Sequence, residues 1–326
     1  MKRPVLGVDV GGTRAKFVVL DHEGMVVQTG DVASDPESPE NTLGTVAAAL
    51  DPSLWQQDAA GSPAYLLSGV GLACAGIVDP ERGWLGRSPN LRGWENSDLF
   101  AAVGKVFGNV DRAVANDVNS ALYGESRRGA GRGCRDLVMI ALGTGVGGGV
   151  ILQGRLVIGA HCGAGEIGHM VLDPAGPVCT CGNRGCLEAY AGSVGLLKAA
   201  RLAAGEKEAG RLRSLLDGRG ATLTTRDLAL LAESGDRAAC ELFAAAGRRL
   251  GQAVGNLINV LDPERVIIGG GVAGAGDLIL EPCRRVASGI VLAVEAKEVP
   301  VVPAELGTGA AALGAALMVA TGENDP

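Results

Sequence analysis

Apolar runs broken by glycine pairs give the chain the pattern of β-hairpins. Residues 4–10 form an apolar, β-branched run that stops at Gly11 and Gly12, and residues 14–20 continue as a second apolar run. Two such runs around a glycine pair predict a hairpin with a tight turn. Residues 25–29 predict a third strand after it.

A similar order of elements recurs roughly 130 residues downstream. A strand, a glycine turn and two further strands are expected there at residues 137–142, 143–148, 149–152 and 155–158. The recurrence predicts a duplicated α/β fold with one phosphate-binding hairpin in each half. We expect an N-terminal domain at residues 1–119 and 307–326. A C-terminal domain that carries the cysteine-rich loop is expected at 120–306.

The other apolar patterns predict helices and buried strands. Asp236 has the chemistry of an N-cap for a long helix that ends before Asp262. Glycines spaced by four residues, at positions 247, 251 and 255, predict close packing of that helix against a neighbour. Further helices are expected at residues 40–50, from 193 onward and at 307–319, and further strands at 66–75 and 265–268.

Composition adds limits on the class of protein. The 326 residues are 47% hydrophobic and 20% charged, which is an ordinary globular balance, and the net charge is −7. An acidic chain argues against a nucleic-acid partner, because binding phosphates needs a clustered basic surface. One basic cluster exists, and we expect it to be a solvated loop; its members are Arg127, Arg128, Arg132 and Arg135.

No leader pattern and no apolar run of about 20 residues is present, so neither secretion nor membrane insertion is expected. Eight cysteines without such a leader indicate a reducing, cytoplasmic setting in which thiols are available to bind metal.

The cysteine loop, residues 169–188, collects candidate metal ligands in one short segment. It holds one imidazole and three thiols, and a carboxylate ends it; these are His169, Cys179, Cys181, Cys186 and Glu188. Four such ligands predict a tetrahedral zinc site that is structural, because no coordination position stays open for chemistry. The alternative is that the cysteines are small buried hydrophobes and the histidine is a polar loop residue. His161 and Cys162 lie just upstream as rival ligands.

Two glycine loops have the chemistry of phosphate sites. The first glycine loop, residues 9–16, reads DVGGTRAK, and the second, residues 142–149, reads LGTGVGGG. Glycine allows backbone N–H groups to approach phosphate oxygens, threonine adds a hydroxyl donor, and Asp9 can hold Mg²⁺ through water. Tight hairpins alone would also explain the glycines. A third glycine run after a predicted strand, residues 269–271, favours a nucleotide site.

Asn116 and Asp117 lie between a predicted strand and a predicted helix. A helix N-terminus favours negative charge, so Asp117 can stay ionised and accept a proton from a substrate hydroxyl. Asn and Asp are also the preferred N-cap residues, so a simple cap is the alternative. The presence of two phosphate loops favours the catalytic role.

Together these motifs resemble the ROK family of sugar kinases and sugar-responsive repressors, and the resemblance covers nearly the whole chain. The matching pieces are the two glycine loops, Asn116–Asp117, residues 165–169 (GEIGH) and the cysteine pattern of the cysteine loop. Residues 86–94 (GRSPNLRGW) resemble a segment of the family's glucokinases, with Arg92 where proline is common. The resemblance implies a two-domain, actin-like ATPase fold, related to ribonuclease H, with the active-site cleft between the domains. The N-terminal domain would bind sugar and phosphate, and the C-terminal domain would hold the nucleotide site and the zinc loop.

The resemblance also implies roles for individual residues. Asp117 would be the general base that accepts the proton of the sugar's 6-hydroxyl. Sugar would be bound by Asn90, Asn116, Asp117, Glu166, His169 and Glu188. Zinc would be held by His169, Cys179, Cys181 and Cys186. ATP with Mg²⁺ would be held by Asp9, Gly11, Gly12, Thr13, Lys16, Gly143, Thr144, Gly145, Gly147, Gly270 and Gly271.

The implied activity is ATP-dependent phosphorylation of a hexose, with glucose first because residues 88–94 fit it best. N-acetylmannosamine, N-acetylglucosamine and other hexoses stay open, since such kinases differ by a few pocket contacts. A sugar-responsive repressor is the rival of another class. It is disfavoured because the first phosphate loop begins at residue 9 and leaves no room for a preceding helix-turn-helix domain. The family's habit implies a homodimer or homotetramer.

Overall fold

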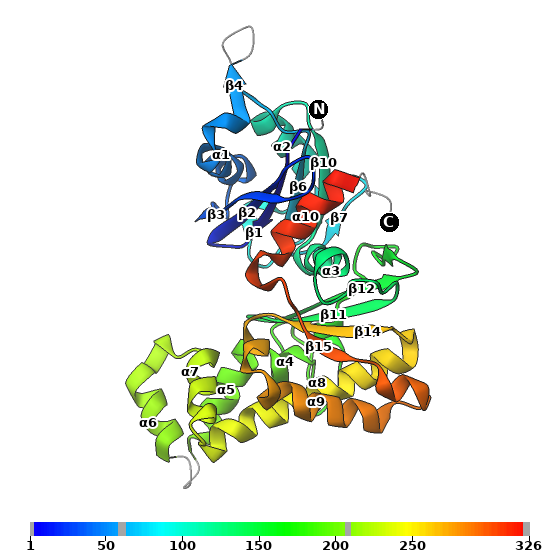
Figure 1. Cartoon of the computed structure of the whole chain (residues 1–326). Helices are drawn as coiled ribbons and strands as arrows, with labels where there is room; N and C mark the ends of the chain where they lie inside the picture. The colour runs from blue at the N-terminus through cyan, green and yellow to red at the C-terminus, as the bar shows by residue number, and fades with distance from the viewer. Residues whose placement is uncertain (1–2, 58–62, 206–209, 322–326) are drawn as a thin grey trace. The chain divides into compact units, whose positions relative to one another are not determined.

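The computed structural model describes residues 3–57, 63–205 and 210–321 (Figure 1). The chain forms two compact units. The first comprises Met1–Gly133, Arg155–Ala164 and Leu306–Pro326, and the second comprises Cys134–Gly154 and Gly165–Glu305. The expected division after residue 119 falls inside a helix, α3 (Asp117–Arg128), which belongs wholly to the first unit. Residues 322–326, assigned from sequence to the N-terminal domain, lie outside the described residues.

The sheet of the first unit contains the predicted N-terminal hairpin. Its strands, in spatial order, are β10 (Asp111–Asn116), β6 (Gly69–Cys74), β1 (Val5–Val10), β2 (Arg14–Leu20) and β3 (Val26–Ala33). β1 pairs antiparallel with β2 and parallel with β6, and Asp9 lies opposite Lys16 in the hairpin register. The predicted strands at 4–10, 14–20 and 66–75 are confirmed, and the third strand runs longer than expected.

Helices cover both faces of this sheet. On one face, α1 (Pro39–Ala49) and α2 (Leu99–Phe107) share a core with the sheet that includes Leu6, Leu43 and Val103. On the other face, α10 (Ala310–Thr321) and α3 pack on β1, β6 and β10, as Figure 1 shows for α10. A Cβ on Gly7 of β1 would lie 2.0 Å from the backbone oxygen of Ala312, so the helix approaches the strand too closely for any side chain there.

Short elements connect the larger ones in the first unit. They are η1 (Pro52–Leu54), β4 (Trp55–Gln57), β5 (Pro63–Tyr65), β7 (Val78–Asp79), β8 (Trp84–Leu85), η2 (Arg92–Trp94), β9 (Ser97–Asp98), β13 (Arg155–Leu156) and η7 (Gly307–Gly309). The loop expected around the basic cluster begins later than predicted. Arg127 and Arg128 form the last turn of α3, where positive charge complements the helix dipole.

The sheet of the second unit repeats the topology of the first. Of its five strands, the four that belong to this unit follow the order β12 (Val146–Leu152), β11 (Leu137–Leu142), β14 (Arg265–Gly269) and β15 (Val301–Pro303). β11 pairs antiparallel with β12 and parallel with β14, and β14 pairs parallel with β15. The same directions relate β2, β1, β6 and β10 in the first unit. The predicted duplication is therefore visible strand by strand.

Helices make up most of the rest of the second unit. They are α4 (Glu188–Ala191), α5 (Ser193–Ala203), α6 (Gly210–Arg219), α7 (Thr225–Glu233), α8 (Arg237–Leu261) and α9 (Asp277–Ile290), with short turns η3 (Ile167–His169), η4 (Gly220–Thr222), η5 (Gly271–Ala275) and η6 (Glu295–Glu298). Asp236 caps α8 as predicted, accepting a hydrogen bond from the Ala239 amide at 2.9 Å. The glycine stripe of α8 packs on α9; a Cβ on Gly251 would lie 2.5 Å from the Cys283 carbonyl oxygen.

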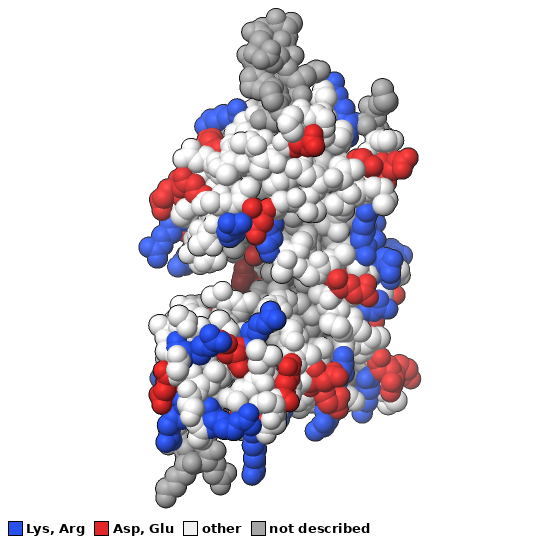
Figure 2. Space-filling view, turned by 60° about the vertical axis from the view of Figure 1, so that its left-hand side comes forward, with Lys and Arg blue, Asp and Glu red and all other residues white. Residues whose placement is uncertain are grey.

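The surface carries charged residues of both signs, as the composition predicts. On the face shown in Figure 2, acidic and basic side chains are intermingled. Among the described residues, we find no helix with the length and apolar character needed to cross a bilayer.

Candidate active site

The first glycine loop forms the tight turn between β1 and β2. The Gly11 amide donates to the Arg14 carbonyl at 2.9 Å, which closes the turn. Ser34, just after β3, makes two hydrogen bonds to this turn. Its hydroxyl donates to the Gly11 carbonyl at 2.7 Å, and its amide donates to the Thr13 carbonyl at 3.1 Å. Ser34 was not among the predicted residues, and only the strand pairing of β2 with β3 brings it here.

Asp9 lies in β1, and its carboxyl group interacts electrostatically with the ammonium group of Lys16 and the carboxylate of Asp117. Burial and the charge of Asp117 raise the pKa of Asp9 to about 7, although the charge of Lys16 acts to lower it. Asp9 and Asp117 are therefore close enough to interact electrostatically. A divalent cation held by these carboxylates would offset this repulsion, which is compatible with the predicted Mg²⁺ role of Asp9.

Asn116 is the N-cap of α3, so this part of the capping alternative is confirmed. Its Oδ1 accepts hydrogen bonds from the amides of Val118 and Asn119 at 2.9 and 3.2 Å, and its Nδ2 donates to the Gly76 carbonyl at 3.1 Å. One Nδ2 hydrogen is left over from these bonds for a substrate hydroxyl. Asp117 follows as the first residue of α3 and is half-buried.

Asn90 lies beside the first glycine loop. A Cβ on Gly12 would be 2.9 Å from the Asn90 carbonyl oxygen, so the two segments touch through their backbones. Buried anchors hold the segment: the Ser88 hydroxyl donates to the Ala75 carbonyl at 2.7 Å, and the Trp94 Nε1 donates to the Asp35 carbonyl at 2.9 Å. The exposed Asn90 side chain is thus presented from a fixed backbone.

In the second unit, the cysteine loop brings the four predicted metal ligands together. The ligand atoms of His169, Cys179, Cys181 and Cys186 all lie within 4.8 Å of one another. The Sγ atoms of Cys181 and Cys186 are 3.8 Å apart, and His169 Nδ1 is 3.8 Å from the Cys179 Sγ. Zn–S bonds of about 2.3 Å at the tetrahedral angle separate two sulfur atoms by about 3.8 Å, so the donor set fits zinc in number, type and spacing.

The thiols also have the electrostatics of a cation site. Burial and the neighbouring Cys181 and Cys179 raise the pKa of Cys186 to about 12. A bound cation would reverse this effect by stabilising the thiolates. The rival ligands His161 and Cys162 belong to the first unit and are not part of the cluster.

The two ring nitrogens of His169 face different neighbours. Nδ1 faces the thiols, while Nε2 lies 4.0 Å from the Glu166 carboxylate on the preceding turn. Glu166 is half-exposed, with 51% of its side chain accessible, so its carboxylate is available to a ligand. This arrangement lets one ring nitrogen bind metal while the other faces a substrate.

Glu188 connects the cysteine loop to the second glycine loop. One carboxylate oxygen accepts hydrogen bonds from the Thr180 hydroxyl and, at 3.4 Å, from the Cys179 thiol. The other oxygen accepts from the Val146 amide at 3.1 Å. Burial acts to raise the pKa of Glu188, but these hydrogen bonds outweigh it and hold the pKa below its usual value. Thr180 is a supporting residue that the sequence motif did not single out.

The second glycine loop has a shorter turn than predicted. β12 begins at Val146, so the turn is limited to Gly143–Gly145, and Gly147 and Gly148 are strand residues. Gly148 stays free of a side chain because the Gly165 carbonyl would lie 2.5 Å from its Cβ. The Gly143 amide donates to the Gly145 carbonyl at 2.9 Å, and the Ser193 amide of α5 donates to the Gly143 carbonyl at 2.9 Å.

The third glycine run lies against the second glycine loop. Gly270 has a φ of +87°, and a Cβ there would lie 2.4 Å from the Leu142 carbonyl oxygen. Gly270 and Gly271 therefore follow β14 directly beside the turn that carries Thr144 and Gly145, as the nucleotide interpretation requires.

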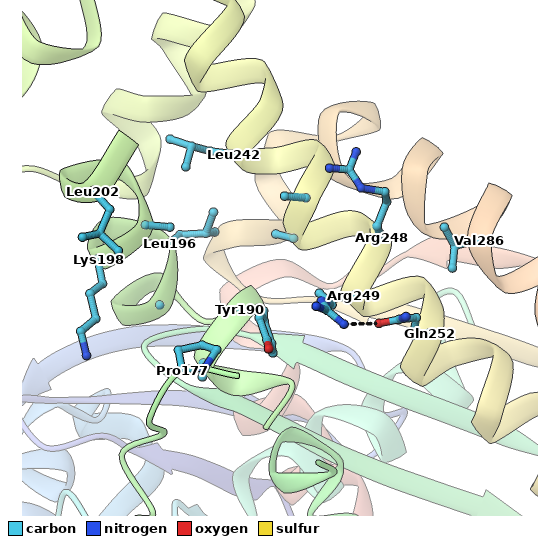
Figure 3. A pocket seen from close by; sticks show the side chains of 15 residues that line it. Pro177, Tyr190, Leu196, Lys198, Leu202, Leu242, Arg248, Arg249, Gln252 and Val286 are labelled. Carbon is cyan, nitrogen blue, oxygen red and sulfur yellow. Dashed lines mark hydrogen bonds between the residues drawn. The ribbon is translucent and has the colours of Figure 1, made fainter. Parts of the chain in front are cut away.

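A cavity of about 770 Å³ is lined mainly by residues of α4, α5 and α8 (Figure 3). Arg249 lines this cavity. Its guanidinium lies 4.7 Å from the centre of the Tyr190 ring, donates a hydrogen bond to Gln252 Oε1 at 3.1 Å and forms an ion pair with Asp173 at 3.3 Å. The lining of the cavity, as the described residues define it, includes no member of the predicted site. These contacts hold the start of the cysteine loop against α8.

Comparison with known proteins decides the family. A family model described as "ROK family" matches residues 5–321. The chain belongs to the ROK family. It is 33% identical over 321 residues to a glucokinase of Halalkalibacterium halodurans, covering 98% of this chain and 96% of the relative. It is 32% identical to a kanosamine kinase of Amycolatopsis mediterranei, covering 98% of this chain and 97% of the relative.

Solved ROK structures have the same fold. The crystal structure of a ROK family glucokinase from Streptomyces griseus, in complex with glucose and AMPPNP, superposes with a TM-score of 0.80 at 32% identity, over 98% of this chain and 99% of that one. The predicted ROK resemblance and the α/β actin-like fold are therefore confirmed.

Proposed function

We propose that this ROK protein is an ATP-dependent hexokinase that transfers a phosphoryl group to the 6-hydroxyl of a hexose, with glucose the first candidate. The observation that supports the proposal is that each unit, taken by itself, gathers one part of the predicted site. Asp117 starts α3 beside Asp9 and the first glycine loop. In the second unit, Glu166 lies near His169, and Glu188 contacts Cys179 of the cysteine loop. The glucokinase relatives of similar length support glucose.

In the proposed reaction, Asp117 accepts the proton of the sugar hydroxyl as that oxygen attacks the γ-phosphorus, while the bond from the γ-phosphorus to the bridging oxygen of ATP breaks and ADP leaves. The backbone N–H groups and threonine hydroxyls of both glycine loops bind the phosphate oxygens. Mg²⁺ bound with ATP supplies charge neutralisation, and Asp9 would hold it through water. Since phosphoryl transfer needs positioning and electrostatic compensation, one base and two phosphate loops suffice.

The sugar-binding role is assigned to residues that the cysteine loop orients. Zinc would be held by His169 Nδ1 and the thiolates of Cys179, Cys181 and Cys186, and it would supply rigidity rather than chemistry. Glu188 stays oriented by the Val146 amide and the Thr180 hydroxyl. His169 Nε2 and Glu166 then face the sugar hydroxyls as acceptors or donors.

The test is a coupled assay of ADP release with Mg-ATP and a panel of hexoses, using protein with measured zinc content. We expect turnover with glucose and a product phosphorylated at the 6-position. Turnover confined to N-acetylmannosamine, N-acetylglucosamine or another hexose would replace glucose as substrate. Folded, zinc-loaded protein without turnover on any hexose would refute the kinase proposal.

We propose a homodimer or homotetramer as the assembly, following the family resemblance. Exposed apolar side chains on the second unit, such as Leu202 with 77% accessibility, give material for such a contact. Light scattering after size exclusion would decide, and a monomeric mass at micromolar concentration would contradict the assembly.

A further inference from the structure

Glu125, two turns after Asp117 in α3, is a completely buried carboxylate with 0% accessibility. Each of its oxygens accepts one backbone N–H. Oε2 accepts from the Ala130 amide at 2.7 Å, and Oε1 accepts from the Leu306 amide at 2.8 Å. A buried carboxylate is costly unless its oxygens are paired, so this arrangement needs both partners at once.

The chain after α3 folds closely around the carboxylate. The amides of Gly129 and Gly131 donate to the Glu125 carbonyl, each at 3.0 Å. A Cβ on Gly129 would lie 1.9 Å from Glu125 Oε2, so only glycine allows this approach. The carboxylate is thus enclosed on the side of residues 129–131 and is held in one position there.

On its other side, Glu125 holds the start of the return segment, residues 306–309, which leads into α10. Two residues after Leu306, the Thr308 carbonyl accepts a hydrogen bond from Lys16 Nζ at 3.3 Å. Lys16 lies opposite Asp9 in the first hairpin. A continuous set of contacts therefore runs from α3 through the return segment to the first glycine loop, all within the first unit.

We propose that Glu125 is a positioning residue for phosphoryl transfer: it fixes the return segment, and through it Lys16, relative to the helix that carries Asp117. The inference rests on the proposed kinase function, in which the first glycine loop binds phosphate and Asp117 is the base. Small displacements between these groups reduce the rate strongly, because reacting atoms must stay aligned.

A purely stabilising role for Glu125 is the alternative, and α3 supplies a matched control. Ser120, also fully buried, donates its hydroxyl to the Ala311 carbonyl at 2.8 Å, so it joins α3 to α10, the helix that follows the return segment. In Glu125→Gln, the isosteric amide turns an NH₂ toward one backbone donor, and one bond is lost. Ser120→Ala also removes one buried bond.

A second pair of variants covers the case in which Glu125→Gln does not fold. Gly307 in the return segment has a φ of +61° with no atom within 4 Å of a Cβ, and Gly108 after α2 has a φ of +77° with equally open space. Alanine at either position introduces backbone strain without a clash. Gly307→Ala disturbs the return segment, whereas Gly108→Ala places the same strain elsewhere in the unit.

The measurements are steady-state kinetics, calorimetric titration with AMPPNP and Mg²⁺, and the melting temperature of each variant. We expect Glu125→Gln and Gly307→Ala to lower kcat/KM for Mg-ATP by about tenfold or more while the glucose KM changes by less than about twofold. Ser120→Ala and Gly108→Ala should lower the melting temperature and keep wild-type kinetics. Equal kinetics in all four variants would overturn the positioning role. A wild-type protein without turnover would instead refute the kinase proposal, and the nucleotide titration would still test the positioning.

Discussion

The carboxylate of Glu188 occupies the space that a side chain at position 145 would need. A Cβ on Gly145 would lie 2.2 Å from Glu188 Oε2, the same oxygen that accepts the Val146 amide at 3.1 Å. The proposed sugar ligand and the second glycine loop therefore constrain each other. Glycine at position 145 therefore leaves room for the Glu188 carboxylate, in addition to any room it leaves for a phosphate.

Gly145→Ala should therefore weaken sugar binding although the residue belongs to a phosphate loop. The added methyl would displace the Glu188 carboxylate from the Val146 amide, and we expect the glucose KM to rise by about tenfold or more. Steady-state kinetics with glucose varied at saturating Mg-ATP provides the measurement.

Gly143→Ala is the matched control for this substitution. A Cβ at Gly143 has its nearest neighbour at 4.0 Å, the Gly145 carbonyl oxygen, so it fits without displacing Glu188. Its glucose KM should stay near the wild-type value, whatever happens to the KM for Mg-ATP. A similar rise in glucose KM for both variants would mean that the loop, rather than Glu188, is affected.

Replacement of one thiol should remove the metal and loosen the sugar ligands. Cys181→Ser takes away an exposed ligand, so the protein should lose its bound zinc, raise its glucose KM and keep its core. Metal analysis by mass spectrometry should give one zinc per wild-type chain and none in the variant. Cys240→Ser is the control, since its side chain lies outside the cluster and donates to the Ala232 carbonyl. Normal kinetics in zinc-free protein would show that the metal is incidental.

Most strands and the cluster of His169 with three cysteines could be predicted because local pattern determines them. Residues 137–142 form a short apolar run that stops at a glycine turn, which is typical of a buried strand, and β11 has those bounds. The turn after it was predicted too long, because glycines in β12 were assigned to the turn. Gly148 is glycine for a different reason: the backbone at Gly165 packs against it.

The supporting contacts could not be predicted, because they join residues far apart in the chain. Glu125 and Leu306 are 181 residues apart, and no local pattern marks either as a partner of the other. Ser34 reaches the first glycine loop only through the pairing of β2 with β3. The sequence motifs therefore predict candidate groups, and the tertiary fold determines how those groups are held.

Removal of the proposed base should separate chemistry from binding. Asp117→Asn keeps the size of the side chain and removes the proton acceptor, so kcat should fall by about 10²–10⁴-fold. Glucose binding, measured by calorimetric titration, should persist because the other five proposed sugar ligands remain in place. Substantial activity in this variant would exclude Asp117 as the base, and Asp111→Asn on the exposed start of β10 serves as a charge-matched control.

The last prediction concerns pH, because the pKa of Asp9 is about 7 in the folded protein and 3.8 as its ordinary value. A raised folded-state pKa means that the folded state binds the proton more tightly. This contribution to stability is fully present below about pH 4 and is lost as the pH rises through 7. The cause is burial first and the charge of Asp117 second, opposed by Lys16. Protein without nucleotide or Mg²⁺ should therefore lose unfolding free energy between pH 5 and pH 8, on the order of a few kcal/mol.

Asp9→Asn should remove this dependence. At pH 8, thermal unfolding should show a higher melting temperature for the variant than for the wild type, and at pH 5 the two should be close. Asp117→Asn should move the wild-type profile part of the way in the same direction, because it removes one of the charges that raise the pKa of Asp9. Parallel pH profiles for Asp9→Asn and the wild type would mean that Asp9 is solvated and ionised across this range, and that it needs no cation to carry its charge.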